Sequence, residues 1–257
     1  MTIRYNISPE DFARRVLFRV SFTQPINLDS IATALGLRMR KVPMNAWDGV
    51  MQKVSDGRAL GTIRIRAGIR PHGRERFTIA HEMGHYLLPG HGTDYRRCTF
   101  SDINVPTKSE PKELEANRFA AALLLPANQI EVRIKHQPFS IDLIRRVASE
   151  FDASLLATAF QCVAETEETC VVIITTDRVV RYYRRSKSWT CAIEVGCPLA
   201  DISVAYRLDL TNNEATDTVH IGAWAPGGWF DVRDEVRENS LYVPEHNMIL
   251  TILSDLR

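Results

Sequence analysis

The spacing of apolar residues predicts two helices at the start of the chain. Ser8 followed by Pro9 is typical of a helix start, because a serine side chain can cap the first backbone amides and proline fits the first turn. This helix is expected to end near Val20. A second helix is expected over residues 28–35, since Gly36 is a residue type that commonly ends helices.

The pattern then changes from helical spacing to alternation. Residues 37–69 are typical of β structure, with a turn at residues 55–57 and a regular apolar–polar alternation over residues 62–66. Helical spacing returns around residue 77, where small and apolar residues recur on one face until Pro89-Gly90, a strong stop signal. We expect a helix of about three turns there.

Gly84 interrupts this helix with a residue that lowers helix stability by roughly 1 kcal/mol relative to alanine. A bare backbone at this position predicts that another segment of the chain approaches it closely. The next helix is expected over residues 110–125, with Ser109 as its cap and Pro126 as its end.

The helix around Gly84 contains the pattern His-Glu-x-x-His at residues 81–85. Residues four apart lie on the same helix face, so His81 and His85 can offer imidazole nitrogens to one metal ion. Glu82 can then reach a water beside that ion as a general base. This is the pattern of zinc-dependent peptidases, although a five-residue match also arises by chance.

A catalytic zinc ion usually has three protein ligands, and the sequence offers three candidates for the third. Glu113 lies in the middle of the apolar face of the helix over residues 110–125, where a carboxylate needs a strong partner. Glu115 lies on the opposite face, with Arg118 as an expected surface partner. His91 follows His81 by ten residues, which is the metzincin spacing.

We favour Glu113 as the third ligand and keep Glu115 and His91 as alternatives. The metzincin pattern has a glycine where this chain has Leu88, which weakens the case for His91. Asn117, one turn after Glu113, is expected to hydrogen-bond a ligating histidine from behind.

At these two segments the chain resembles the ImmA/IrrE family of metallopeptidases. The resemblance covers roughly residues 25–165 and is carried by residues 77–88 and 113–126. It implies a zincin-like domain in which His81, His85 and Glu113 bind zinc and Glu82 is catalytic. It also implies a bacterial or phage-related peptidase, of which several relatives cleave a helix-turn-helix repressor. Pro89 departs from the family pattern, where a histidine is common.

Composition is that of an ordinary globular protein, with 45% hydrophobic and 25% charged residues. A net charge of +1 argues against a dedicated polyanion-binding protein. The first residues do not form a secretory signal, no segment has the length of apolar residues needed to span a membrane, and the five cysteines are scattered. We therefore expect a cytoplasmic protein without a disulfide framework.

We predict an α+β protein with two domains. The first, residues 1–166, is the peptidase-like domain and includes a helix-turn-helix-like pair over residues 140–165. An acidic link precedes a second domain, residues 170–257, expected to be mostly β or α+β and regulatory. Its strands are predicted near residues 170–180, 191–195, 218–224, 240–243 and 248–253.

The function predicted from these patterns is zinc-dependent endoproteolysis of a protein substrate, such as a repressor, with manganese or cobalt as alternative metals. We expect the strand at residues 62–66 to provide a sheet edge for an extended substrate. Two alternatives stay open: a non-catalytic zinc-binding regulatory protein, and a DNA-binding regulator. Direct nucleic-acid binding is not favoured, because the second helix of the pair, residues 155–163, has no lysine or arginine.

Overall fold

The computed structural model describes residues 7–20, 22–45, 47–53, 61–91, 96–98, 110–209, 211, 213–225 and 234–256. The predicted turn at residues 55–57 and the predicted cap Ser109 lie outside these residues. The chain divides into two compact units: residues 1–127 with 148–157, and residues 128–147 with 158–257. The predicted helix pair contributes to both units, so a domain boundary near residue 166 stays a prediction.

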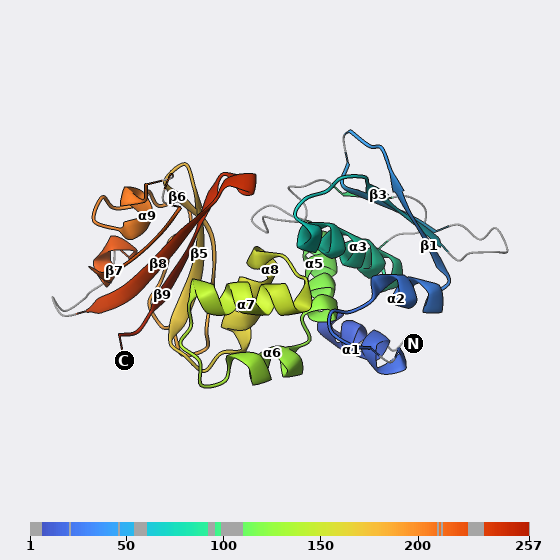
Figure 1. Cartoon of the computed structure of the whole chain (residues 1–257), viewed down its shortest axis with the longest axis horizontal. Coiled ribbons are helices and arrows are strands. Elements are labelled where there is room, and N and C mark those ends of the chain that lie inside the picture. The colour runs from blue at the N-terminus through green and yellow to red at the C-terminus, as the bar shows by residue number, and fades with distance from the viewer. Residues whose placement is uncertain are drawn as a thin grey trace. The chain divides into compact units, whose positions relative to one another are not determined.

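The first unit combines a mixed sheet with packed helices (Figure 1). Its described elements are α1 (Pro9–Arg19), α2 (Leu28–Ala34), β1 (Leu37–Val42), β2 (Gly49–Gln52), β3 (Gly61–Arg66), α3 (His72–Leu87), β4 (Arg96–Cys98) and α5 (Pro111–Leu124). Ser8 caps α1 by accepting the backbone N–H of Asp11 at 3.1 Å, as predicted. Helix α3 packs against β2 and β3 and also against α5, and α5 in turn packs against α1.

The sheet of the first unit has the strand order β1-β3-β2-β4 within the described residues. Strand β3 pairs in parallel with β1 and antiparallel with β2, so it is an interior strand. The prediction that residues 62–66 form a free edge is therefore wrong. Their alternation reflects burial of one face, with Ile63 and Ile65 in the core, and it does not specify which strands become neighbours.

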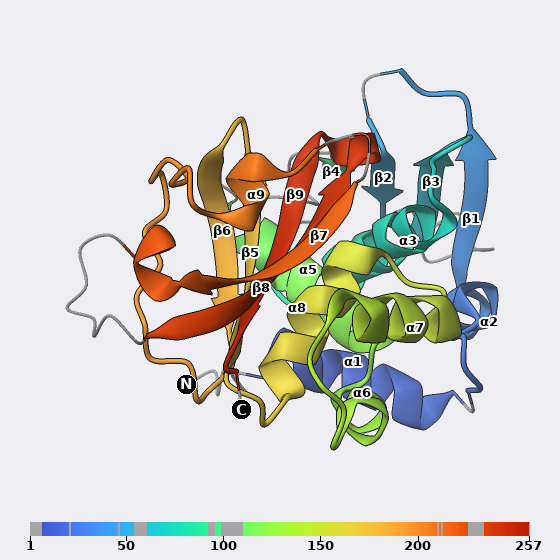
Figure 2. The same ribbon diagram turned by 60° about the vertical axis from the view of Figure 1, so that its left-hand side comes forward.

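The second unit contains an antiparallel sheet with the order β6-β5-β9-β8-β7 in its described part (Figure 2). Its strands are β5 (Cys170–Thr176), β6 (Val179–Arg185), β7 (Glu214–His220), β8 (Glu235–Val243) and β9 (Met248–Ser254). The helices of this C-terminal half are α6 (Ala127–Ile134), α7 (Ile141–Phe151), α8 (Leu155–Glu165) and the short α9 (Val204–Arg207), which packs against β7 and β8.

The α+β class and the β-rich C-terminal part are confirmed, and α7 and α8 match the predicted helix pair. Four of the five predicted C-terminal strand regions contain strands. The exception is residues 191–195, which form no strand, although Ile193 is buried among the core residues of the unit. Across the described residues, no helix combines the length and apolar character needed to span a bilayer.

A buried carboxylate joins the parts of the second unit. Glu238, on β8, is fully buried and accepts the backbone N–H of Ala205 at 2.7 Å and the indole N–H of Trp224 at 2.8 Å. It also accepts the hydroxyl of Ser240 at 3.1 Å. Burial raises the pKa of Glu238, while these hydrogen bonds oppose the rise. The Glu238 carboxylate therefore links α9 and the segment around Trp224 to strand β8 of the sheet.

Replacing Glu238 with alanine should destabilise the protein by about 3 kcal/mol, because buried donors would lose their acceptor. The free energy of unfolding from urea denaturation measures this change. Glu235→Ala is the matched control, since Glu235 is exposed on the same strand and its loss should stay within about 0.5 kcal/mol. Equal effects of the two substitutions would contradict the anchoring role of Glu238.

Candidate metal centre

Helix α3 carries the His-Glu-x-x-His segment deep inside the first unit. It begins at His72, several residues earlier than the sequence pattern indicated, and ends at Leu87. His81, Glu82 and His85 are all fully buried. Burying three ionisable side chains within one and a half helical turns costs folding free energy unless they contact one another or a bound ion.

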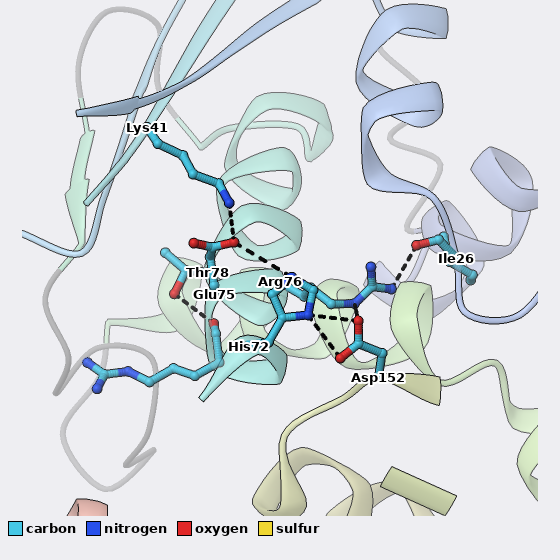
Figure 3. Close-up of polar contacts among 8 residues, drawn as sticks. Ile26, Lys41, His72, Glu75, Arg76, Thr78 and Asp152 are labelled. Carbon is cyan, nitrogen blue, oxygen red and sulfur yellow. Dashed lines mark hydrogen bonds and ion pairs between the residues drawn. The ribbon is translucent and has the colours of Figure 1, made fainter. Parts of the chain in front are cut away.

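Polar contacts hold the first turns of α3 (Figure 3). Glu75 is buried and accepts the Lys41 ammonium at 2.6 Å. Asp152 lies 2.8 Å from Nδ1 of His72 and 3.5 Å from Nε of Arg76. Arg76 also donates to the carbonyl oxygen of Ile26 at 2.7 Å. These contacts come from distant parts of the sequence, which explains why the apolar pattern alone did not place the helix start.

Glu113 of α5 reaches both histidines of α3. Its Oε2 lies 3.1 Å from Nε2 of His81 and 3.1 Å from Nε2 of His85, and the two Nε2 atoms are 3.0 Å apart. Ligands of a tetrahedral zinc ion at its usual bond lengths lie about 3.3 Å from one another. The three side chains therefore form a cluster that could hold a metal ion, and their donor set suits zinc.

The approach of α5 depends on the missing side chain of Gly84. A Cβ atom at this position would lie 3.1 Å from Cδ1 of Phe119 and 3.2 Å from Cα of Ala116. Both of these residues are fully buried on α5. The prediction that a neighbouring segment comes close to Gly84 is confirmed, and that segment carries Glu113.

The charge states of the cluster favour metal binding. The pKa of His85 is lowered to about 4, mainly because burial penalises the charged ring, so its imidazole is neutral at pH 7. Burial alone would raise the pKa of Glu113, but its contacts with His81 and His85 hold it below its ordinary value. Two imidazoles and one carboxylate are the ligand set His₂Glu of catalytic zinc sites.

A second ring of side chains lies behind the two imidazoles. Oδ1 of Asn117 is 2.9 Å from Nδ1 of His81. Nδ1 of His91 is 2.9 Å from Nδ1 of His85, and Nε2 of His91 is 2.8 Å from Oε2 of Glu115. The structure thus places the two rival candidates for the third ligand behind His85, on the side away from Glu113.

The surface partner expected for Glu115 was Arg118, and this prediction is wrong. Arg118 instead donates two hydrogen bonds to the carboxylate of Glu10, at 2.7 and 2.9 Å. The turn after α3 explains the difference, because it brings His91 back to α5, where Glu115 pairs with it.

Glu82 faces the sheet rather than α5. A Cβ atom at position 49, the first residue of β2, would overlap Oε1 of Glu82. The preceding residue, Asp48, is buried and accepts hydrogen bonds from Arg66 at 2.7 and 2.9 Å and from Arg74 at 2.5 Å. The start of β2 is therefore held beside the Glu82 carboxylate. Nothing in the spacing of Asp48 and Gly49 along the sequence links them to α3.

Comparison with solved structures finds a similar fold. A structure described as a Mycobacterium tuberculosis transcriptional regulator has a similar fold, with a TM-score of 0.58 and 15% sequence identity. The alignment covers 96% of this chain and 76% of the other. No curated protein matches the sequence significantly.

The sequence also matches the family Peptidase_M78, described as the IrrE N-terminal-like domain, over residues 32–162. This match spans α3, α5 and the cluster between them, and it covers just over half of the chain. The family implies a domain of the zinc-metallopeptidase type. The chain therefore belongs to the IrrE N-terminal-like domain family, Peptidase_M78.

Proposed function

We propose that this protein is a zinc-dependent endopeptidase that regulates transcription by cleaving a helix-turn-helix repressor or a similar protein. The main support is the convergence of His81, His85 and Glu113 on one point, with Glu82 adjacent to His81 in the same buried turn. A structural zinc site would not need an additional carboxylate of this kind. The structural neighbour described as a transcriptional regulator supports a regulatory role.

The proposed chemistry is hydrolysis of a peptide bond. A bound zinc ion would lower the pKa of a water ligand to about 7 and polarise the scissile carbonyl. Glu82 accepts a proton from the attacking water and passes it to the nitrogen of the leaving amine. Asn117 accepts from Nδ1 of His81, which leaves the lone pair of that ring on Nε2.

We further propose that the β-rich region over residues 170–257 serves regulation or substrate capture rather than chemistry. The three proposed ligands and Glu82 all belong to the first compact unit. A regulatory region outside the catalytic cluster is the arrangement expected if a signal controls when the peptidase acts.

The ligand assignment predicts different effects for two glutamates of one helix. Glu113→Ala removes a proposed ligand, so the purified protein should lose its zinc on dialysis. Glu115→Ala should still bind one zinc ion per chain at saturating metal. Elemental analysis of both variants measures the difference, and equal zinc contents would overturn the assignment of Glu113.

The proposed base predicts a separation between metal binding and hydrolysis. Glu82→Gln should keep its zinc and its melting temperature but lose proteolysis by several orders of magnitude, because the amide cannot accept the proton. The same variant can trap uncleaved substrate, which identifies a protein for the assay with the wild type. Cleavage of that substrate by Glu82→Gln at nearly the wild-type rate would rule out this mechanism.

Gly49 offers a second test of where the base lies. The added methyl group of Gly49→Ala displaces the flexible end of Glu82 rather than the backbone, so folding should tolerate it. Proteolysis should fall roughly a hundredfold, because the displaced carboxylate no longer aligns with the water. Zinc content and the melting temperature serve as controls and should remain close to those of the wild type. Unchanged proteolysis would mean that the position of this carboxylate does not limit the reaction.

A further inference from the structure

We propose that His91 and Glu115 form a positioning pair that fixes the tautomer and orientation of His85 as a metal ligand. This inference rests on the proposed metal-binding role of His85. It gives a role to two residues whose positions in the sequence suggested only rival ligands.

The direction of each hydrogen bond follows from the chemistry of the acceptors. A carboxylate only accepts, so Nε2 of His91 must carry the hydrogen that Glu115 receives at 2.8 Å. We take the ring of His91 to be neutral, which leaves its Nδ1 unprotonated and able to accept from Nδ1 of His85 at 2.9 Å. His85 is left with its lone pair on Nε2, the atom that faces Glu113 at 3.1 Å.

Burial strengthens the hydrogen bonds that run from Glu115 through His91 to His85. His91 is only 1% exposed, so its ring is shielded from competing water. The side chain of Glu115 is 46% exposed, and its charge remains solvated while it orders the buried ring. Carboxylate groups placed behind a ligating histidine in this way raise the basicity of the ligand and hold its ring in place.

The backbone accounts for the position of His91. Helix α3 ends at Leu87, and Gly90 adopts a positive φ of 78°, a conformation that glycine readily accepts. The chain reverses there, and His91 returns to the His85 ring, with ring centroids 5.1 Å apart. His91 therefore approaches the nitrogen of His85 that does not face Glu113.

The two ligating histidines are thus supported in different ways. His81 has a direct acceptor, Asn117, whereas His85 has an indirect one through His91. Glu113, Glu115 and Asn117 all belong to α5. Helix α5 therefore supplies the proposed ligand Glu113, the acceptor Asn117 behind His81, and the glutamate that pairs with His91.

Zinc affinity of the full-length protein tests the positioning pair. Competition with a fluorescent chelator should show that His91→Leu and Glu115→Ala weaken zinc binding roughly 10- to 100-fold, the usual effect of losing such a contact. His91→Asn should recover much of the affinity, because its side-chain oxygen can accept from Nδ1 of His85. Glu115→Gln should likewise be milder than Glu115→Ala, since the amide oxygen still accepts.

The double variant shows whether Glu115 acts through His91. His91→Leu combined with Glu115→Ala should bind zinc within about twofold of His91→Leu alone, because the second change removes a partner that is already lost. Glu167→Ala, which removes an exposed glutamate, is the control and should leave affinity unchanged. Melting temperatures of the metal-free variants check that the fold is intact.

Cobalt substitution distinguishes positioning from ligation. All variants should bind one cobalt ion at saturation, with tetrahedral absorption bands that shift in energy but retain their intensity. Wild-type zinc affinity in both His91→Leu and Glu115→Ala would overturn the inference. So would loss of the tetrahedral bands in His91→Leu, which would make His91 a ligand. These measurements do not depend on proteolysis, so a failure of the proposed peptidase activity would be seen separately.

Discussion

The close approach of α3 and α5 is the contact on which the candidate metal centre depends. A glycine at position 84 favours it, because a Cβ atom there would lie only 3.1 Å from Cδ1 of Phe119 and 3.2 Å from Cα of Ala116. The approach carries the carboxylate of Glu113 to within 3.1 Å of two imidazole nitrogens. An ionised carboxylate in such a buried place is unfavourable by itself. The packing of α3 against α5 holds it there in spite of that penalty.

The side of α3 that faces the sheet is also constrained by charged contacts. Asp48 receives hydrogen bonds from Arg66 at the end of β3 and Arg74 in the first turn of α3. A buried carboxylate bound by two guanidinium groups tolerates little movement, because displacement would leave a charge without its partners. Since Gly49 follows Asp48 directly, this network also fixes the backbone against which Glu82 lies. The proposed ligands and the proposed base are therefore positioned from different faces of the same helix.

Much of this site was accessible from the sequence, since its main signals are local. The pair of histidines four residues apart, the glycine between them and a glutamate centred on an apolar helix face are all features of a single segment. The start of α3 was not accessible, because Lys41, Asp152 and Ile26 stabilise it from distant positions. Strand order was also inaccessible, and so β3 was placed at an edge although it lies between β1 and β2. In the C-terminal part, residues 191–195 have the composition of a strand, yet they form no strand, and Ile193 contributes to the core from an irregular segment.

The spacing of polar residues on α5 shows why Glu113 could be placed beside the two histidines from the sequence, whereas the partner of Glu115 could not be found. Glu113 and Asn117 are one turn apart, so they share a face and meet opposite ends of the His81 ring. Glu115 lies on the other face, which periodicity alone would assign to solvent, and its side chain is indeed partly exposed. What periodicity does not contain is the reversal at Gly90, which brings His91 within reach of that face. A polar residue on the outer face of a helix can therefore belong to a buried site when another segment folds back over it.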